Sequence, residues 1–183
     1  MCYRKFLLIQ NYSENMNVNV VCTLFAVIMP IEVFVWAQDP CTPWIYNIES
    51  RKCYRKYCDK RNYEDAQKVC QQQGGNLVTI CSEAENNFAA LMGFVATGYP
   101  DQDPEDTWIG LRRNPNNRQQ FQWMSGSSCS YTNWYTREPT DWNNVENYVH
   151  FWIENGYDVW NDNSPRLFHY ICERSTCPQE EVP

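Results

Sequence analysis

Residues 62–85 read NYEDAQKVCQQQGGNLVTICSEAE, and this stretch decides the predicted fold class. Asn62 is a favourable N-cap residue, and the apolar residues after it recur at helical spacing, which predicts a helix over residues 63–73. The pair Gly74–Gly75 ends this helix. The segment Ser82–Glu85 has the pattern of a capping box, which predicts the start of a second helix.

Short apolar runs predict strands in the rest of the chain. One run, Leu77–Ile80, joins the two helices. The later runs are separated by clusters of Asn, Pro, Gly and Asp, and they lie at residues 108–111, 121–123, 148–152 and 168–172. Two early helices followed by short strands and long loops are typical of an α+β fold. The second helix is expected to bury an apolar face made of Phe88, Leu91, Met92 and Val95.

The composition supports a folded domain and argues against a nucleic-acid partner. Aromatic residues make up 15% and hydrophobic residues 43% of the 183-residue chain, so a packed core can form. Lys and Arg number 15 against 22 Asp and Glu, which gives a formal net charge of −7. A protein that neutralises phosphates needs the opposite balance. We therefore expect no nucleic acid among the partners.

Cysteine is unusually frequent, with ten residues against two histidines. The closest cysteine pairs, Cys53/Cys58 and Cys172/Cys177, do not have the CxxC spacing of a zinc module. Disulfide bonds formed in an oxidising compartment are the better interpretation.

The first part of the chain predicts an export signal. Val20–Ile31 carries no charge and is mostly apolar, and its length suits the hydrophobic region of a signal peptide. Cleavage after Ala37 is expected to remove residues 1–37, with an uncleaved membrane anchor as the alternative. The mature chain then holds eight cysteines, in a domain over residues 38–177 with a polar tail over residues 178–183.

A series of short motifs runs through the mature chain. They are Cys53-Tyr54, Tyr63-x-x-Ala66-x-x-x-Cys70, Gly75-x-Leu77-Val78, Ser82-Glu83-Ala84-Glu85, Trp108-Ile109-Gly110-Leu111, Trp123, Thr132-Asn133-Trp134, Glu138-Pro139, Trp160-Asn161-Asp162 and Ile171-Cys172-Glu173. In this order and at this spacing, the series resembles the C-type lectin-like domain family over about Cys41 to Glu173. The resemblance implies two helices flanking small antiparallel sheets, with a long calcium- and ligand-binding loop between Trp108 and Trp160.

The same resemblance implies part of the disulfide pattern. Cys70 would bridge Cys172 and tie the first helix to the last strand. Cys41 would bridge Cys53, as in the longer form of the domain. Three pairings stay open for the remaining cysteines, which are Cys58, Cys81, Cys129 and Cys177.

The chain departs from the family in the second bridge. The two cysteines that form this bridge in the family are replaced by Tyr148 and Pro165. The long loop therefore lacks its usual staple, and a bridge through Cys81 or Cys129 would compensate for it.

The resemblance further implies a calcium site, whose ligands would be Glu138, Thr140, Glu146, Asn161 and Asp162. Calcium takes 6–8 oxygen ligands, and in the family two vicinal sugar hydroxyls replace its bound water. Thr140 departs from the family, which has Asn or Asp at this position. An Asn supplies a carbonyl oxygen to the metal and an amide donor to the sugar, whereas a hydroxyl has one oxygen for both tasks, so we expect weaker calcium binding or an altered sugar geometry. The adjacent Asp141 offers a carboxylate that would substitute for it.

The residues expected to contact a sugar are Glu138, Thr140, Glu146, Asn161 and Trp142, the last by stacking on the ring. Glu138 in the first position of its motif favours sugars of the mannose, fucose and N-acetylglucosamine type. We expect a secreted protein that binds glycans on glycoproteins or cell surfaces through one Ca²⁺. The alternative is a calcium-independent member of the family that binds a protein ligand through the long loop.

The sequence shows no arrangement for catalysis. His150 and His169 lie on predicted strands, and no Ser or Cys is spaced to act with them as a nucleophile. We therefore expect both histidines to be ordinary core or surface residues and the protein to be no enzyme.

Overall fold

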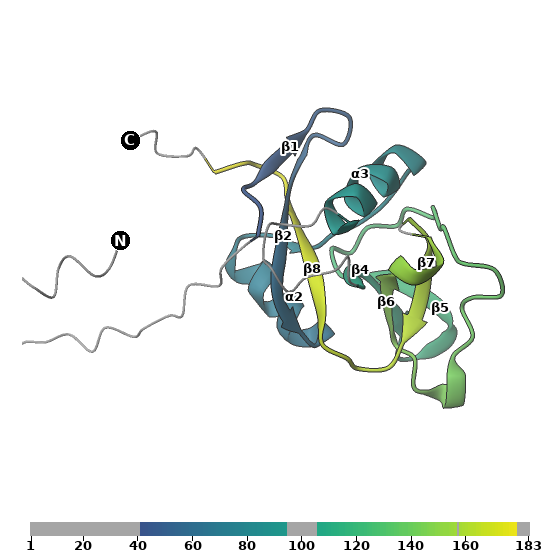
Figure 1. Ribbon diagram of the computed structural model, residues 1–183. Coiled ribbons are helices and arrows are strands. Elements are labelled where there is room, and N and C mark those ends of the chain that lie inside the picture. Colours follow the sequence, from purple (N-terminus) through teal and green to yellow (C-terminus); the bar gives the residue numbers. More distant parts are fainter. Residues whose placement is uncertain (1–40, 95–105, 157, 179–183) are drawn as a thin grey trace, which may run out of the picture. The chain divides into compact units, whose positions relative to one another are not determined.

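The computed structural model describes residues 41–94, 106–156 and 158–178 of the chain (Figure 1). The expected signal peptide, the first residues of the expected domain, Val95 and residues 179–183 lie outside the described residues. The described chain folds into two α-helices and a mixed β-sheet held by four disulfide bonds, which confirms the predicted α+β class.

Helix α2, Tyr63–Gln72, confirms the first predicted helix. The side-chain Oδ1 of Asn62 caps it by accepting a hydrogen bond of 2.9 Å from the amide of Asp65. Gly74 follows the helix with a left-handed φ of 78°, a conformation that glycine adopts without steric cost.

Helix α3, Glu83–Phe94, begins at the predicted place, with the predicted Ser82 cap and with Glu85 bonded to Cys81 in place of Ser82. Ser82 Oγ accepts a hydrogen bond of 3.2 Å from the amide of Glu85, and the Glu85 carboxylate accepts one of 2.6 Å from the amide of Cys81. The predicted apolar face is wrong at Leu91, whose side chain is 55% exposed.

The face that α3 does bury consists mainly of small residues, which are Asn86, Ala89, Ala90, Met92 and Gly93. A Cβ atom added at Gly93 would lie 3.5 Å from Thr107 Oγ1, so the helix lies close to the sheet. This close packing selects the small residues and leaves Leu91 in solvent. Neither helix of the described chain is long and apolar enough to cross a bilayer.

The strands are β1 (Ile45–Asn47), β2 (Lys52–Arg61), β3 (Asn76–Leu77), β4 (Thr107–Asn114), β5 (Asn117–Trp123), β6 (Tyr148–Phe151), β7 (Trp160–Asn163) and β8 (Phe168–Arg174). Their order in the sheet is β1-β2-β8-β4-β6-β7, with β3 paired to β8 and β5 paired to β4. The β4–β8 pair is parallel, and the other pairs are antiparallel. Figure 1 shows β2 and β8 side by side at the centre of the described chain.

The predicted strand at Leu77–Ile80 is shorter than expected, because only β3 forms a ladder there. Beyond it, the amide of Val78 donates to the carbonyl of Ile171 at 2.9 Å, and the amide of Gly110 donates to the carbonyl of Val78 at 2.7 Å. A Cβ atom at Gly110 would lie 2.5 Å from the Leu77 carbonyl oxygen. Glycine is therefore required for this segment to pass between β8 and β4.

The buried side chains form two clusters. The cluster next to α3 contains Tyr54, Val78, Ile80, Ala89, Ala90, Met92, Ile109, Leu111, Trp123, Val149, Phe151, Trp160 and Ile171. The cluster next to α2 contains Tyr57, Tyr63, Ala66, Val69, Cys70, Leu77, Trp108, Tyr170 and Cys172. His150 and His169 are both buried, so they lie in the core, one of the two positions expected for them.

The disulfide bonds confirm one pairing and correct another. Cys70 is bonded to Cys172, as expected. The expected Cys41–Cys53 bridge is wrong, because Cys41 is bonded to Cys58 and Cys53 to Cys177.

Strand register explains the corrected pairing. The amide of Cys41 donates to the carbonyl of Lys56 at 3.1 Å, which places Cys41 near the end of β2 that carries Cys58. Cys53 lies opposite Arg174 of β8, and the chain beyond this residue leads directly to Cys177.

The fourth disulfide bond, Cys81–Cys129, joins the start of α3 to the long segment between β5 and β6. The bridge expected through Cys81 or Cys129 is thus present, at a different position from the absent family bridge. Where that bridge would have begun, Tyr148 instead stacks on Tyr63 with ring centroids 4.4 Å apart.

Removal of the Cys81–Cys129 bond is expected to lower the free energy of unfolding substantially. The bond closes a loop with a sequence separation of 48 residues. The chain-entropy model assigns about 4 kcal/mol to a loop of this length. Urea unfolding of a Cys81→Ala/Cys129→Ala variant measures the loss, with the wild-type protein as reference. A loss below about 1 kcal/mol would show that this bond does not stabilise the segment.

Candidate functional site

The predicted site residues lie on the long segment between β5 and β6 and on β7, which lies next to β6 (Figure 1). The segment contains a cis peptide bond at Glu138–Pro139 and a short 3-10 helix, η1, Trp142–Asn144. Four non-glycine residues near η1 have left-handed backbones; these are Arg137, Asp141, Asn143 and Asn144. Asp and Asn tolerate this conformation better than most residues, so the sequence suits a series of tight turns.

Thr140 brings three of the predicted carboxylates together. Its amide donates to Glu138 Oε2 at 2.9 Å and to Asp162 Oδ1 at 3.0 Å. Its hydroxyl donates to Glu146 Oε2 at 3.0 Å. The structure therefore gathers Glu138, Thr140, Glu146 and Asp162 at one place, although they come from the long loop and from β7.

The carboxyl group of Glu138 is held in a crowded acidic environment. Partial burial raises its pKa, and the neighbouring Asp162 carboxylate raises it further. The hydrogen bonds from Thr140 oppose this shift. Glu138 and Asp162 therefore form a carboxylate pair that a cation would stabilise.

Asn161 is oriented by the buried His150. The amide nitrogen Nδ2 of Asn161 lies 3.3 Å from His150 Nε2, and the other ring nitrogen, Nδ1, lies 2.9 Å from the carbonyl of Phe151. Burial lowers the pKa of His150 to about 4, so the ring is neutral at physiological pH. A neutral ring that donates from Nδ1 accepts at Nε2, which leaves the Oδ1 of Asn161 for another partner.

Arg113 is a site residue that none of the sequence motifs identifies. Its side chain, on β4, is buried and forms an ion pair with the fully buried carboxylate of Asp162. Its Nε donates to the carbonyl of Glu146 at 2.9 Å, and its Nη1 donates to the carbonyl of Arg118 at 2.6 Å. One guanidinium thus fastens the long loop, β5 and β7 to β4.

A second arginine takes Asp141 away from the expected ligand role. Arg118 Nε donates to Asp141 Oδ2 at 2.9 Å, and the Arg113 guanidinium lies 3.8 Å from the same oxygen. Arg118 lowers the pKa of Asp141, so this carboxylate stays ionised and paired. The backbone amide of Asp141 also donates to Asp162 Oδ2 at 3.0 Å, and this bond holds the turn at Asp141 in place.

No local signal in the sequence identifies the two arginines. Arg113 and Arg118 lie on strands, where a long charged side chain usually reaches solvent. They contact the long loop because β4 and β5 pair with each other next to it. Spacing along the chain carries no information about that contact.

The side chains around Thr140 have the oxygen ligands and the negative charge that a calcium site needs. The available groups are carboxylates, a hydroxyl and an amide carbonyl, which are the hard ligands that calcium prefers. The cluster contains four carboxylates, those of Glu138, Asp141, Glu146 and Asp162. The guanidinium groups of Arg113 and Arg118 pair with two of them, so acidic side chains outnumber basic ones by two.

The side chains as they stand do not form a complete cage. Within residues 41–94, 106–156 and 158–178, no group of three or more His, Cys, Asp or Glu side chains is placed to hold a metal ion. Glu138 and Glu146 are partly exposed, so their side chains can turn towards an ion without disturbing the core. Asp162 cannot turn, because it is buried against Arg113.

The two aromatic residues beside the site differ in exposure. Trp142 is 69% exposed, and its amide donates to Glu146 Oε2 at 2.6 Å, so it stands directly next to the carboxylates. Tyr135 packs against Trp152 with ring centroids 5.2 Å apart. Of the two, Trp142 offers the free ring face.

Comparison with known proteins agrees with this architecture. Residues 59–174 match the family model described as "Lectin C-type domain". A relative from Notechis scutatus scutatus, named "C-type lectin mannose-binding isoform", is 32% identical over 140 residues, which cover 75% of this chain and 85% of the relative. An "Alpha-N-acetylgalactosamine-specific lectin" from Patiria pectinifera is 31% identical over 151 residues, which cover 77% and 84%.

A solved structure supports the same conclusion. The C-type lectin CEL-I from Cucumaria echinata superposes with a TM-score of 0.62 at 29% identity, over 72% of this chain and 94% of that protein. Domains of this kind typically hold calcium, and the relatives support carbohydrate binding in general. On the family model, the relatives and the fold together, this chain belongs to the C-type lectin domain family.

Proposed function

We propose that the protein is a secreted glycan-binding protein whose long loop recognises sugar hydroxyls at one calcium ion. The observation that carries this proposal is the convergence of Glu138, Glu146 and Asp162 on Thr140. A bound calcium ion would supply coordination positions for two neighbouring sugar hydroxyls.

The residues have distinct roles in this proposal. Glu138 and Glu146 would hold the ion with their free carboxylate oxygens, and the Oδ1 of Asn161 would add an amide oxygen. Thr140 would contribute its hydroxyl, or would align the two glutamates if its hydroxyl stays bonded to Glu146. Asp162 already accepts three hydrogen bonds and would contribute at most one remaining lone pair.

The class of sugar follows from the first motif position. Glu138 favours ligands of the mannose, fucose and N-acetylglucosamine type, and a relative named for mannose binding supports this assignment. Affinity for a single monosaccharide is expected to be weak, because the contact is small and polar.

An extracellular location is supported by the cysteines. Eight cysteines of the described chain form four disulfide bonds, which persist in oxidising compartments and are rare in the cytosol. Export by the segment 1–37, with a domain beginning near residue 38, is part of this proposal. We assign a binding role and no reaction, in keeping with a family of binding domains.

A second function is favoured by the Arg113–Asp162 ion pair. This guanidinium already supplies a positive charge next to the carboxylates, so the loop has an internal cation where calcium would otherwise act. In this alternative, the loop is ordered without metal and binds a protein ligand.

A glycan array probed with and without chelator separates the two functions. The proposed function predicts binding to mannose-type glycans that is lost with EDTA and restored by excess calcium. Binding that resists EDTA, together with capture of a purified protein ligand, would support the alternative. An array that is silent in both conditions would contradict glycan recognition by the loop.

Replacement of Trp142 by alanine is expected to weaken glycan binding about fivefold. The exposed indole offers a stacking face worth about 1 kcal/mol beyond its buried area. Calorimetric titration with methyl α-mannoside measures the change. Ile48→Ala is the control, because Ile48 is 79% exposed next to β1, at the opposite edge of the sheet from β7. Equal affinities of the two variants would remove Trp142 from the sugar site.

A further inference from the structure

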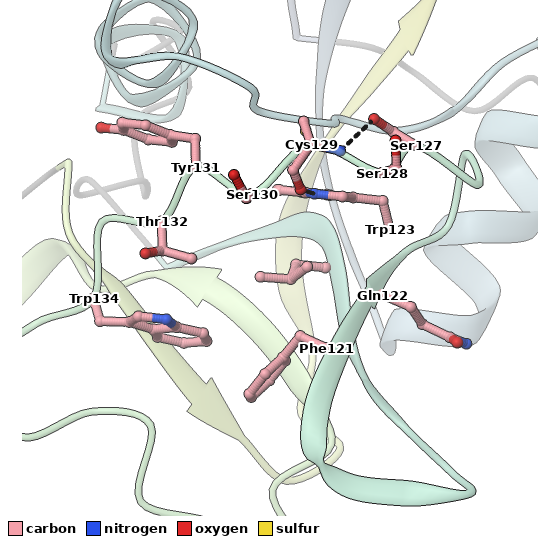
Figure 2. Close-up of a pocket in the computed structure, with 11 residues that line it drawn as sticks. Phe121, Gln122, Trp123, Ser127, Ser128, Cys129, Ser130, Tyr131, Thr132 and Trp134 are labelled. Atoms are coloured by element: carbon pink, nitrogen blue, oxygen red, sulfur yellow. Dashed lines mark hydrogen bonds between the residues drawn. The ribbon is translucent and has the colours of Figure 1, made fainter.

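A cavity lies beside the proposed sugar site, between β4, β5 and the loop that the Cys81–Cys129 bond anchors (Figure 2). Its volume is about 260 Å³, somewhat below the range of about 300–1,000 Å³ that is usual for drug-sized ligands. The residues that line it are Leu111, Phe121, Gln122, Trp123, Ser127, Ser128, Cys129, Ser130, Tyr131, Thr132 and Trp134. The size suits one small ring.

The lining combines aromatic faces with hydroxyl groups and carries no charged side chain. Phe121 and Trp134 pack together with ring centroids 4.9 Å apart. In Figure 2 they lie on one side of the cavity, and the loop residues 129–131 lie on the opposite side. An uncharged ligand with an apolar face and a polar rim fits such a lining.

The polar groups of the loop are available to a ligand. In the described part of the chain, no hydrogen bond engages the side-chain hydroxyls of Ser128, Ser130, Tyr131 or Thr132. The loop that carries them is nevertheless fixed, because Trp123 Nε1 donates to the carbonyl of Cys129 at 3.2 Å and Cys129 is bonded to Cys81. A fixed row of free hydroxyls loses little entropy when it binds.

The cavity is linked to the long-loop site by one side-chain contact and one backbone bridge. The guanidinium of Arg113, which holds Asp162, lies 4.5 Å from the centre of the Phe121 ring. Trp134 is paired through its backbone with Trp160, the residue before Asn161. The two places are therefore neighbours in the fold.

We propose that this cavity is a second saccharide subsite, which takes one neutral sugar unit between the Phe121–Trp134 face and the hydroxyls of residues 128–132. Neutral sugars match it because a pyranose ring has an apolar face and a rim of hydroxyls. This inference rests on the proposed glycan-binding function for its class of ligand. It does not require calcium, because the cavity lining has no carboxylate.

The subsite can be tested by NMR on the ¹⁵N-labelled protein with mannotriose, chitotriose and their methyl monosaccharides. The indole N–H of Trp134 reports on the cavity, and that of Trp142 reports on the long loop. At least one trisaccharide is expected to shift the Trp134 signal in a saturable way, and to do so also in EDTA. A shift of Trp142 alone would overturn the subsite and leave the proposed function intact. A shift of Trp134 alone would support the subsite and contradict the long-loop site.

A double variant, Ser130→Ala/Thr132→Val, separates a local ligand from an effect transmitted from the long loop. In this variant, the dissociation constant measured from the Trp134 signal is expected to rise about tenfold, because two hydrogen bonds to the sugar are lost. The dissociation constant measured from the Trp142 signal is expected to stay unchanged. Ser175→Ala/Thr176→Val is the matched control, because both residues are exposed and lie after β8. Equal Trp134 titrations for the two double variants would overturn the proposal. So would a Trp134 shift produced by a neutral Ala/Ser peptide and by neither trisaccharide.

Discussion

The Arg113→Met variant is expected to lose about 3–5 kcal/mol of unfolding free energy. Removal of one partner from a buried ion pair leaves the other as an uncompensated charge, and the Asp162 side chain is fully buried. The variant also leaves two backbone carbonyls, those of Arg118 and Glu146, without the guanidinium that they accept from. Chemical denaturation at neutral pH measures the loss.

Two further variants show whether the lost stability belongs to the ion pair. Arg113→Lys keeps the charge but not the planar fork that reaches three partners, so an intermediate loss is expected. Adding Asp162→Asn to Arg113→Met removes the orphaned charge and is expected to recover part of the loss. A loss below about 1 kcal/mol for Arg113→Met, or no recovery in the double variant, would contradict the role given to this pair.

The Arg113→Met variant also tests whether the guanidinium group or a calcium ion orders the long loop. With Arg113 absent, Asp162 has no cation beside it, so calcium is expected to raise the unfolding midpoint more in Arg113→Met than in the wild type. Amide hydrogen exchange over residues 138–147 in EDTA is expected to be faster in the variant. Unchanged exchange would show that Arg113 does not order the loop.

The Glu138→Gln/Glu146→Gln variant is expected to weaken calcium binding at least about 100-fold. Groups that only support metal ligands are commonly worth 10–100-fold in affinity, and this variant neutralises two proposed ligands. Both glutamates are partly exposed, so the fold is expected to persist. Calorimetric titration with calcium, followed by a glycan, measures the two affinities.

The control for this variant is Glu49→Gln, which lies on the exposed turn between β1 and β2. It changes the net charge without touching the loop, and it is expected to bind calcium as the wild type does. A Glu138→Gln/Glu146→Gln variant that retains wild-type calcium affinity would place the ion elsewhere or exclude it from the site.

Local features of the fold could be predicted from the sequence. The caps of α2 and α3 depend on residues three positions apart, so Asn62 and Ser82 mark the helix starts correctly. The Cys70–Cys172 bond was also foreseen, because it accompanies the motifs that carry the family resemblance. Leu91 was misplaced because burial on α3 depends on how closely the helix lies to the sheet.

Features that depend on register and on distant contacts could not be predicted. The partners of Cys41 and Cys53 follow from the pairing of β2 with its neighbours, which no local pattern encodes. Four of the five proposed calcium ligands are brought together, and their positions came from the family motifs. Arg113 has no such motif, although it neutralises the buried Asp162 and fastens the long loop to β4.

The most direct test of glycan recognition through calcium is a crystal structure of the chain with calcium chloride and methyl α-mannoside. One ion is expected about 2.3–2.6 Å from oxygen atoms of Glu138, Glu146 and Asn161, with two sugar hydroxyls completing its coordination. Arg113 is expected to stay on Asp162. A structure in which these side chains surround no ion, and in which the sugar is absent from the long loop, would contradict glycan recognition through calcium.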